Sequence, residues 1–499
     1  MGIIENQGIR GTAYSYIGVA IGFVTAGILM PLFLSTEEIG ALEMLVTWAS
    51  VFATLATLGI NSVTNRLFPY FRDAQNHHKG YFSILAIVIV IGLTLSICLF
   101  LLVKPVIIQD SLEKSALLIN YIDLIVPLMI FITVFMVVDI YYAVLYNAVK
   151  GIFLKEFLQR ILILAVLLFF YFEVFDFSAL VMAYVGALSL PGILILMSLT
   201  RDGELVFKSP RPNLSGDLLK SMASVALFGI AVTFSNSLIQ YVDRIMINSM
   251  LGLDATGIYR VAFFYGTLVI IPLRALSKIS AVVVAQAWKD NKQEEVKSVY
   301  YKSTIDQLLI GLLVFVGIWG NIDNIFHILP AEYEGGKYVI FFIGLTNLLI
   351  MAAGVSGAII STSRHYKILS LFIIVFGLLV VITNWIFIKA FGISGAAIAS
   401  AISALAYSLM RVIFLKNKFS MQPYTYRHLL IIGIGAVSYL ASLLVPDLVP
   451  ESNKIPGLVL DVLLRSAVII GVFMGLVYIF KLSPDLQRFV GKIMKRLQS

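Results

Sequence analysis

Long apolar runs separated by short polar segments fill almost the whole chain. About 20 consecutive apolar residues are enough for a helix to span a bilayer, and about fourteen runs reach that length. They lie near residues 12–34, 38–62, 81–103, 117–148, 152–172, 178–199, 217–250, 255–286, 303–326, 337–362, 367–389, 393–415, 428–446 and 457–480. The pattern therefore predicts an all-α polytopic membrane protein with about 14 transmembrane helices.

Composition supports this class. Apolar side chains make up 60% of the 499 residues and charged ones only 13%, whereas soluble domains have roughly 45–50% and about 25%. Cys98 is the only cysteine, which excludes a disulfide within the chain and a cysteine-based metal site. We expect no cofactor and no metal.

The distribution of basic residues predicts the orientation. Lys and Arg concentrate on the segments that lie inside when the N-terminus is cytoplasmic, as the positive-inside rule requires. With fourteen spans both termini are then cytoplasmic. Inside loops that face anionic lipid also explain the net charge of +8, so no nucleic-acid partner is expected.

The two halves of the chain show a weak internal repeat. A shift of 217 residues lays 34–43 on 251–260 and matches Gly40 with Gly257, and a shift of 216 lays 175–183 on 391–399. Nearly constant spacing at this length indicates duplication, here of a six-helix bundle related by an axis along the membrane normal. We expect two pseudo-symmetric six-helix lobes at 1–199 and 217–426, a cytoplasmic linker at 200–216, and two extra C-terminal helices with a basic amphipathic tail at 427–499.

Among the ionisable residues inside the runs, the candidates for a gate or for ion coupling are Glu43, Asp243, Arg244 and Asp139. Asp243 and Arg244 lie in the outer third of the seventh run, Arg260 lies at the start of the eighth, and Glu43 is its equivalent under the shift. An ion pair between Glu43 and Arg260 could form when the halves close. Alternatively, Asp243 and Arg244 fix a helix end while Arg260 snorkels outwards. Asp139 in the fourth run is either a proton site or a partner of core polar groups.

Basic residues form a stripe along the eighth run. At about 100° per residue, Arg260, Arg274 and Lys278 share one helix face. A charge facing lipid at mid-membrane costs about 2.5–3.5 kcal/mol, so this face predicts a wet, anion-binding cavity. Asn61, which aligns with Lys278 under the same shift, joins it from the other half together with Arg66. The alternative is that Lys278 and Arg66 lie at the cytoplasmic interface and only follow the positive-inside bias.

Three segments carry a family resemblance. Residues 241–262, YVDRIMINSMLGLDATGIYRVA, resemble the signature of spans seven and eight in Wzx-type polysaccharide flippases. Residues 329–338, LPAEYEGGKY, and 383–403, TNWIFIKAFGISGAAIASAIS, are similar to that family's segments before span ten and at span twelve. Their order and spacing match the multidrug/oligosaccharidyl-lipid/polysaccharide (MOP) exporter superfamily along essentially the whole chain.

The resemblance implies a flippase of the bacterial cytoplasmic membrane. Such proteins move a polyprenyl-diphosphate-linked oligosaccharide from the inner to the outer leaflet by alternating access through a cationic cavity. The expected partners are this glycan, membrane lipids and the polysaccharide polymerase machinery, and coupling to H⁺ or Na⁺ stays open. The alternatives are a lipid II flippase and a cation-coupled drug exporter of the MATE type. An enzyme is not expected, because the outer loops are short and hold no nucleophile or metal constellation.

Overall fold

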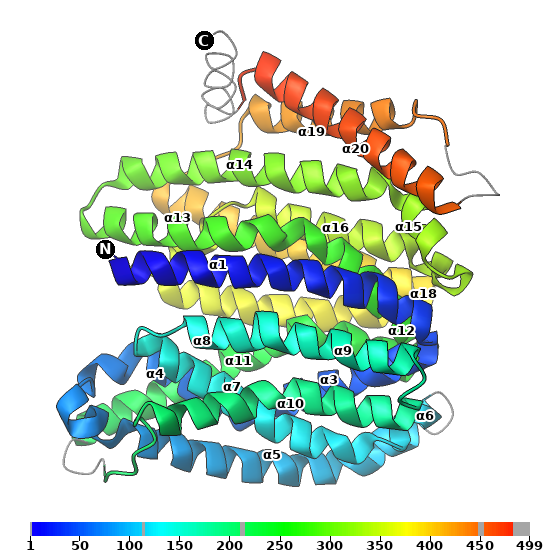
Figure 1. Cartoon of the computed structure of the whole chain (residues 1–499). Coiled ribbons are helices and arrows are strands. Elements are labelled where there is room, and N and C mark those ends of the chain that lie inside the picture. Colours follow the sequence, from blue (N-terminus) through cyan, green and yellow to red (C-terminus); the bar gives the residue numbers. More distant parts are fainter. Residues whose placement is uncertain (1, 112–114, 210–214, 448–453, 483–499) are drawn as a thin grey trace. The chain divides into compact units, whose positions relative to one another are not determined.

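The computed structural model describes residues 2–111, 115–209, 215–447 and 454–482, although the side chains of residues 2–9, 110–111, 274–279 and 454–455 fall outside that description. The chain divides into two compact units, Met1–Arg260 and Val261–Ser499 (Figure 1). The predicted amphipathic tail, at 483–499, lies outside the described residues.

Met1–Arg260 is a bundle of long helices joined by short turns. Its α-helices are α1 (Gly2–Gly22), α2 (Met30–Phe33), α3 (Thr36–Ala56), α4 (Ile60–Leu67), α5 (Tyr81–Ser111), α6 (Ala116–Ile119), α7 (Ile125–Val144), α8 (Val149–Ile152), α9 (Gln159–Tyr171), α10 (Phe177–Arg201), α11 (Gly216–Leu251) and the start of α12 (Leu253–Thr267). Two π-helical segments, η1 (Phe23–Leu29) and η5 (Phe153–Leu158), interrupt the first and fifth predicted spans. The short 3₁₀ turns are η2 (Phe68–Tyr70), η3 (Ala74–Gly80) and η4 (Ile122–Leu124).

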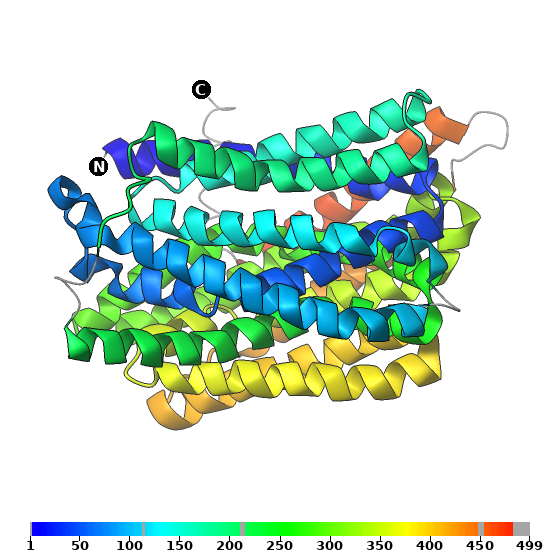
Figure 2. The ribbon, with the colours of Figure 1, turned by 90° about the horizontal axis from the view of Figure 1, so that it is seen from below.

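Packing in this unit centres on α3 and α7. Helix α7 packs on α3, α5 and α10, and α3 packs also on α5 and α11; Figure 2 shows several of these helices running roughly parallel. At one end, fully buried rings of Phe68, Tyr81 and Tyr141 form an aromatic core. This arrangement leaves the facing sides of α3, α7, α10 and α11 inside the bundle.

Val261–Ser499 contains the remaining helices. They are the rest of α12, η7 (Leu268–Ile270), α13 (Ile271–Lys289), α14 (Gln293–Gly320), α15 (Ile322–Ile328), η8 (Ala331–Gly336), α16 (Lys337–Ala352), α17 (Ser356–Thr362), α18 (Tyr366–Phe419), α19 (Tyr426–Ser442) and α20 (Lys454–Ile479). Helices α19 and α20 lie alongside each other and both pack on α14 (Figure 1). Arg465 donates to Asp461 at 2.5 Å within α20, and Asn324 of α15 donates to the same carboxylate.

Helix α18 is a hairpin rather than one straight helix. Gly392 has φ 58° and ψ −139°, which only glycine adopts without strain. Thr383 and Ser403 hydroxyls are 3.0 Å apart on either side of this turn, and the rings of Phe376 and Tyr407 stack at 4.7 Å. The chain therefore reverses at Gly392, where the sequence predicts the gap between the runs 367–389 and 393–415.

The fold prediction is confirmed in its main point, since the protein is an all-helical polytopic membrane protein. Within the described residues, eleven helices are long and apolar enough to cross a membrane, the α18 hairpin being one of them. The predicted runs 152–172 and 428–446 are helical but are not among the eleven. The count of fourteen stays a prediction, and so do the boundaries of the lobes.

Candidate functional site

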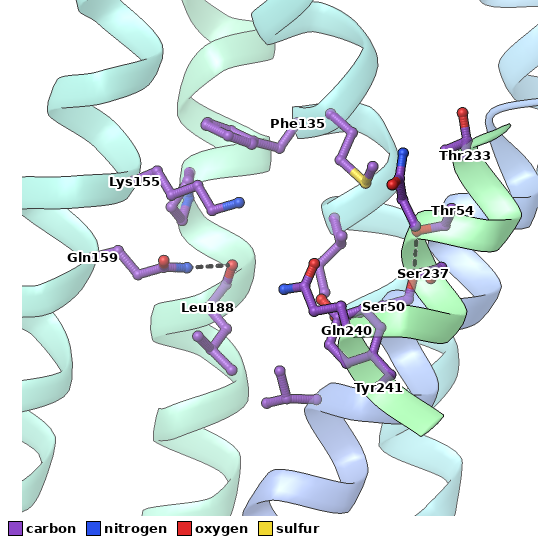
Figure 3. A pocket seen from close by; sticks show the side chains of 15 residues that line it. Ser50, Thr54, Phe135, Lys155, Gln159, Leu188, Thr233, Ser237, Gln240 and Tyr241 are labelled. Carbon is purple, nitrogen blue, oxygen red and sulfur yellow. Dashed lines mark hydrogen bonds between the residues drawn. The ribbon is translucent and has the colours of Figure 1, made fainter. Parts of the chain in front are cut away.

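A cavity of about 460 Å³ lies inside Met1–Arg260, between α3, α7, α10, α11 and the segment from η5 to α9. Its polar lining consists of Ser50, Thr54, Lys155, Gln159, Thr233, Asn236, Ser237, Gln240 and Tyr241. Lys155 and Gln159 approach from one side, and the α3 and α11 residues from the other (Figure 3). Amide and hydroxyl groups share the lining with apolar side chains, so the cavity can replace water around the polar part of a ligand.

Lys155 is the only charged residue among the described residues that line the cavity. Its ammonium lies 5.7 Å from the centre of the Phe135 ring, and it has no salt-bridge partner among the described side chains. Its neighbours on the same segment are paired, Lys150 with Asp202 and Arg160 with Glu156. Lys155 therefore offers the cavity a positive charge that is not held in a salt bridge, although Asp139 interacts with it electrostatically.

The helix geometry around Lys155 is irregular. Lys155 belongs to η5, a π-helical segment between α8 and α9. Insertion of a residue into a helix rotates the side chains on either side of the π-turn, and such turns are frequent at functional sites. The remaining lining residues supply donors: the Ser237 hydroxyl is 95% buried and has no hydrogen-bond partner. The cavity is thus rich in groups that could bind a hydroxylated anion.

A cluster of three charges lies at one end of this cavity. Glu43 forms salt bridges with both arginines: its Oε1 lies 2.6 Å from Arg244 Nε, and its Oε2 accepts a hydrogen bond from Arg260 Nε at 3.0 Å. Its carboxylate is 88% buried, and both arginine side chains are at least 82% buried. Tyr184 of α10 interacts electrostatically with Arg260 as well. The Glu43 cluster, as we call Glu43, Arg244 and Arg260, joins three helices through one carboxylate.

Two glycines bring the Glu43 cluster together. A Cβ atom on Gly40 would lie 2.1 Å from the carbonyl oxygen of Leu253, and one on Gly257 would lie 1.9 Å from that of Thr36. Helices α3 and α12 therefore cross with backbones in contact, which only glycine allows. Glu43 and Arg260 each follow their glycine by three residues, almost one helical turn, so the crossing places the two side chains beside each other.

Further hydrogen bonds join α12 to α3 and to α11. The Thr36 hydroxyl donates to Asp254 at 2.6 Å, and the Tyr259 hydroxyl donates to Asp243 at 2.8 Å. Asp243 is 96% buried. It faces Tyr259 of the neighbouring helix, while Arg244, the next residue along α11, turns to Glu43.

The Glu43 cluster and the cavity are one helical turn apart. Val46 lines the cavity one turn after Glu43 on α3, and Gln240 lines it one turn before Arg244 on α11. Arg244 also donates to the Gln240 carbonyl at 2.6 Å and lies 5.8 Å from the Tyr241 ring centre. A movement of Arg244 would therefore disturb the cavity wall directly.

The other residues singled out from the sequence lie elsewhere or outside the description. Asp139 on α7 packs on Gly151 and interacts electrostatically with Lys155. Asn61 of α4 is half-buried and Arg66 is exposed in the last turn of that helix; neither lines the cavity. Arg274 and Lys278 lie on α13, and their side chains are outside the described residues. Their assignment to a binding site remains a prediction.

Lys155 and the residues around it were missed from the sequence. In GIFLKEFLQR (151–160) three charges follow one another closely, and the sequence pattern by itself assigns them no role. Glu156 and Arg160 are spaced for an i,i+4 pair, which would have left Lys155 as the unmatched charge. The spacing of Glu156 and Arg160 was therefore the feature of the sequence that could have identified Lys155.

Comparisons with known proteins agree on family and fold. The model of the family described as polysaccharide biosynthesis protein matches residues 9–284, more than half of the chain. No curated protein matches. Among solved structures, the lipid II flippase MurJ in an inward closed conformation aligns with a TM-score of 0.69 and 14% identity over 95% of this chain and 98% of that one.

Two transporters described as members of the MOP superfamily are similar as well. An inward-facing multidrug resistance MATE family transporter has a TM-score of 0.65 and 14% identity, covering 83% of this chain and 98% of its own. A transporter from Pyrococcus furiosus has a TM-score of 0.52 and 16% identity, covering 85% and 97%. At these identities the likeness establishes the fold alone. The chain belongs to the polysaccharide biosynthesis protein family, and it has the fold of solved membrane transporters of the MOP superfamily.

Proposed function

We propose that this protein is a flippase that moves a polyprenyl-diphosphate-linked oligosaccharide from the inner to the outer leaflet of a bacterial cytoplasmic membrane. The observation that carries the proposal is the polar cavity with the unpaired Lys155 inside a membrane-embedded helix bundle. Membership of the polysaccharide biosynthesis protein family supports the glycan as cargo. Both termini are cytoplasmic in this proposal, and the chain crosses the membrane fourteen times.

The chemistry of the cargo explains why such a cavity is needed. An unaided diphosphate crossing hydrocarbon faces a desolvation cost of tens of kcal/mol, and each unpaired sugar hydroxyl adds several more. Lys155 supplies a positive charge for an anionic group, while Asn236, Gln240 and Ser237 offer hydrogen bonds to sugar hydroxyls. The prenyl tail can remain in lipid. The proposed binding set also retains Arg274, Lys278, Arg66, Asn61 and Arg260 from the sequence.

In this proposal the Glu43 cluster is the outer gate. Its three charges satisfy one another while α3 and α12 are crossed at Gly40 and Gly257. Opening the crossing towards the outside would separate Glu43 from Arg260 and let water and the glycan pass. Arg244 contacts the cavity wall through Gln240, so cargo in the cavity can act on the gate.

The driving force can be the membrane potential alone. When the inside of the membrane is negative, outward movement of an anion is favourable by about 2.3 kcal/mol per charge per 100 mV. Coupling to H⁺ or Na⁺ is therefore optional, and Asp139, the electrostatic neighbour of Lys155, is its first candidate, beside Glu43 and Asp243. Association with polysaccharide polymerase machinery would place the exported glycan where it is used.

Lipid mass spectrometry of gently purified protein tests the proposal. The wild type should carry a polyprenyl-diphosphate glycan, and Lys155→Met should lose most of it. Lys150→Met is the matched control, because it removes the same charge five residues away, where Asp202 already pairs with it; it should retain the lipid.

Other outcomes would favour other functions. Co-purification of lipid II would support peptidoglycan precursor as cargo, in line with the MurJ fold. Absence of any prenyl lipid from the wild type, together with stabilisation by cationic drugs, would overturn the flippase proposal and favour a drug exporter.

A further inference from the structure

Arg411 is a buried charge that the proposed transport mechanism does not use. It lies in the second half of the α18 hairpin, within Val261–Ser499, and only 6% of its surface is exposed. Lys416 and Lys418, in the last turn of the same helix, are exposed. Arg411 therefore does not follow the common pattern of basic residues that reach the membrane interface.

The immediate surroundings of Arg411 provide no negative charge. Its guanidinium lies 4.3 Å from the centre of the Tyr407 ring, and one Nη donates to the Ser408 hydroxyl at 3.3 Å. Its Nε has no hydrogen-bond partner, and no described carboxylate forms a salt bridge with it. An isolated charge removed from water is costly unless it is paired or neutralised.

Other unsatisfied donors gather from neighbouring helices. The Tyr300 hydroxyl of α14 is buried without a hydrogen-bond partner, and it interacts electrostatically with Arg411. The Ser356 hydroxyl at the start of α17 is fully buried and also unpaired. The next residue, Gly357, is so close that a Cβ on it would lie 3.4 Å from Arg411 Nη1. Helices α14 and α17 thus each carry an unpaired buried hydroxyl, and both helices lie close to the fixed positive charge of Arg411.

We propose that Arg411, Tyr300 and Ser356 form a binding site for a small inorganic anion of chloride size. A guanidinium has no acceptor, so the group that completes this site must be an acceptor with negative charge. The close approach of Gly357 to Arg411 Nη1 favours a monatomic ion over a bulkier lipid headgroup. This site is separate from the transport cavity, whose lining residues all belong to Met1–Arg260. Its occupation would tie α14, α17 and α18 together.

Thermal unfolding of the purified full-length protein tests this site. Sodium gluconate is exchanged for sodium chloride or bromide at constant ionic strength, so that general salt effects cancel. A ligand that binds only the folded state raises the melting temperature with its concentration. We expect a rise that saturates with chloride in the wild type and is absent in Arg411→Gln. Lys155→Met, which removes a cation from the other unit, should keep the full chloride response.

If Arg411→Gln does not fold, a second variant tests the same site. Tyr300→Phe keeps the ring and the charge of Arg411 but removes one donor, and it should raise the half-saturating chloride concentration about threefold or more. Equal melting curves in gluconate and chloride for the wild type would overturn the proposal. So would an unchanged chloride response in Arg411→Gln or in Tyr300→Phe. Equal curves for the wild type would mean that the Tyr407 ring and neighbouring hydroxyls alone stabilise the guanidinium. An unchanged response in a variant would mean that chloride binds elsewhere.

Discussion

The Glu43 cluster and the cavity around Lys155 lie one helical turn apart in the same unit. The charges of the cluster are paired in salt bridges, whereas the charge in the cavity is not. In the cluster one carboxylate satisfies two arginines at 2.6 and 3.0 Å. In the cavity a single ammonium contacts an aromatic ring and has no salt-bridge partner among the described residues. Satisfied charges hold helices together, whereas an unsatisfied one is available to a ligand. The position of a charge in the membrane does not distinguish these roles; its partners do.

Removing the shared carboxylate should have the largest effect. Glu43→Gln leaves Arg244 and Arg260 without a counter-charge in a largely buried place, which typically costs about 3–5 kcal/mol. We expect a strong fall in melting temperature and loss of glycan export. The exchange Glu43→Arg with Arg260→Glu should recover part of the stability. Unchanged stability in Glu43→Gln would mean that the cluster does not hold the helices.

Neutralising Lys155 should affect transport and not stability. A hydrogen bond to a charged group contributes about 1.5–3 kcal/mol, so Lys155→Met should lower export roughly tenfold to a hundredfold. Because no salt bridge is lost, the melting temperature should stay close to that of the wild type. Lys155→Arg should retain most of the export, measured as surface glycan in a strain that lacks the native protein. Equal export by Lys155→Met would remove Lys155 from the binding site.

An increase in the distance between α3 and α12 should weaken the salt bridges of the Glu43 cluster. Gly257→Ala puts a methyl group 1.9 Å from the Thr36 carbonyl oxygen, so α3 and α12 must move apart at a cost of about 1–3 kcal/mol. The distance between Glu43 and Arg260 then increases, and melting temperature and export both fall. Gly186→Ala on α10 is the matched control, because nothing lies within 4 Å of the added atom. Similar behaviour of the two variants would contradict the role of the crossing.

A peripheral ion pair should have the smallest effect. The Lys150 ammonium donates to the Asp202 carboxylate just after α10 and holds the pKa of that carboxyl below its ordinary value of 3.8. A lowered pKa stabilises the fold at pH values above the ordinary pKa, and this contribution disappears as the pH falls through the folded-state value. Asp202→Asn should therefore lower the melting temperature slightly at pH 7. The difference from wild type should shrink as the pH falls below the ordinary pKa and vanish once the pH is below the folded-state pKa; a difference that grows there would contradict this sign.

The sequence was sufficient for the helical membrane class because burial in lipid requires long apolar runs, which are visible residue by residue. The repeat also drew attention to Glu43 and Arg260, since equivalent positions follow equivalent glycines. Their contact could not be derived from spacing alone, because it depends on backbones crossing at Gly40 and Gly257. Lys155 and Arg411 escaped notice for a related reason. Both lie among ordinary basic residues, and only the folded chain shows which charges have partners.

A reversible cross-link across the helix crossing tests the central claim most directly. Thr36 and Asp254 have short side chains joined by a 2.6 Å hydrogen bond, so Thr36→Cys with Asp254→Cys can form a disulfide in a Cys98→Ser background. If the crossing is the outer gate, oxidation should stop glycan export, reduction should restore it, and neither treatment should affect the single-cysteine variants. Export at the wild-type rate by the fully oxidised protein would show that α3 and α12 do not separate during transport.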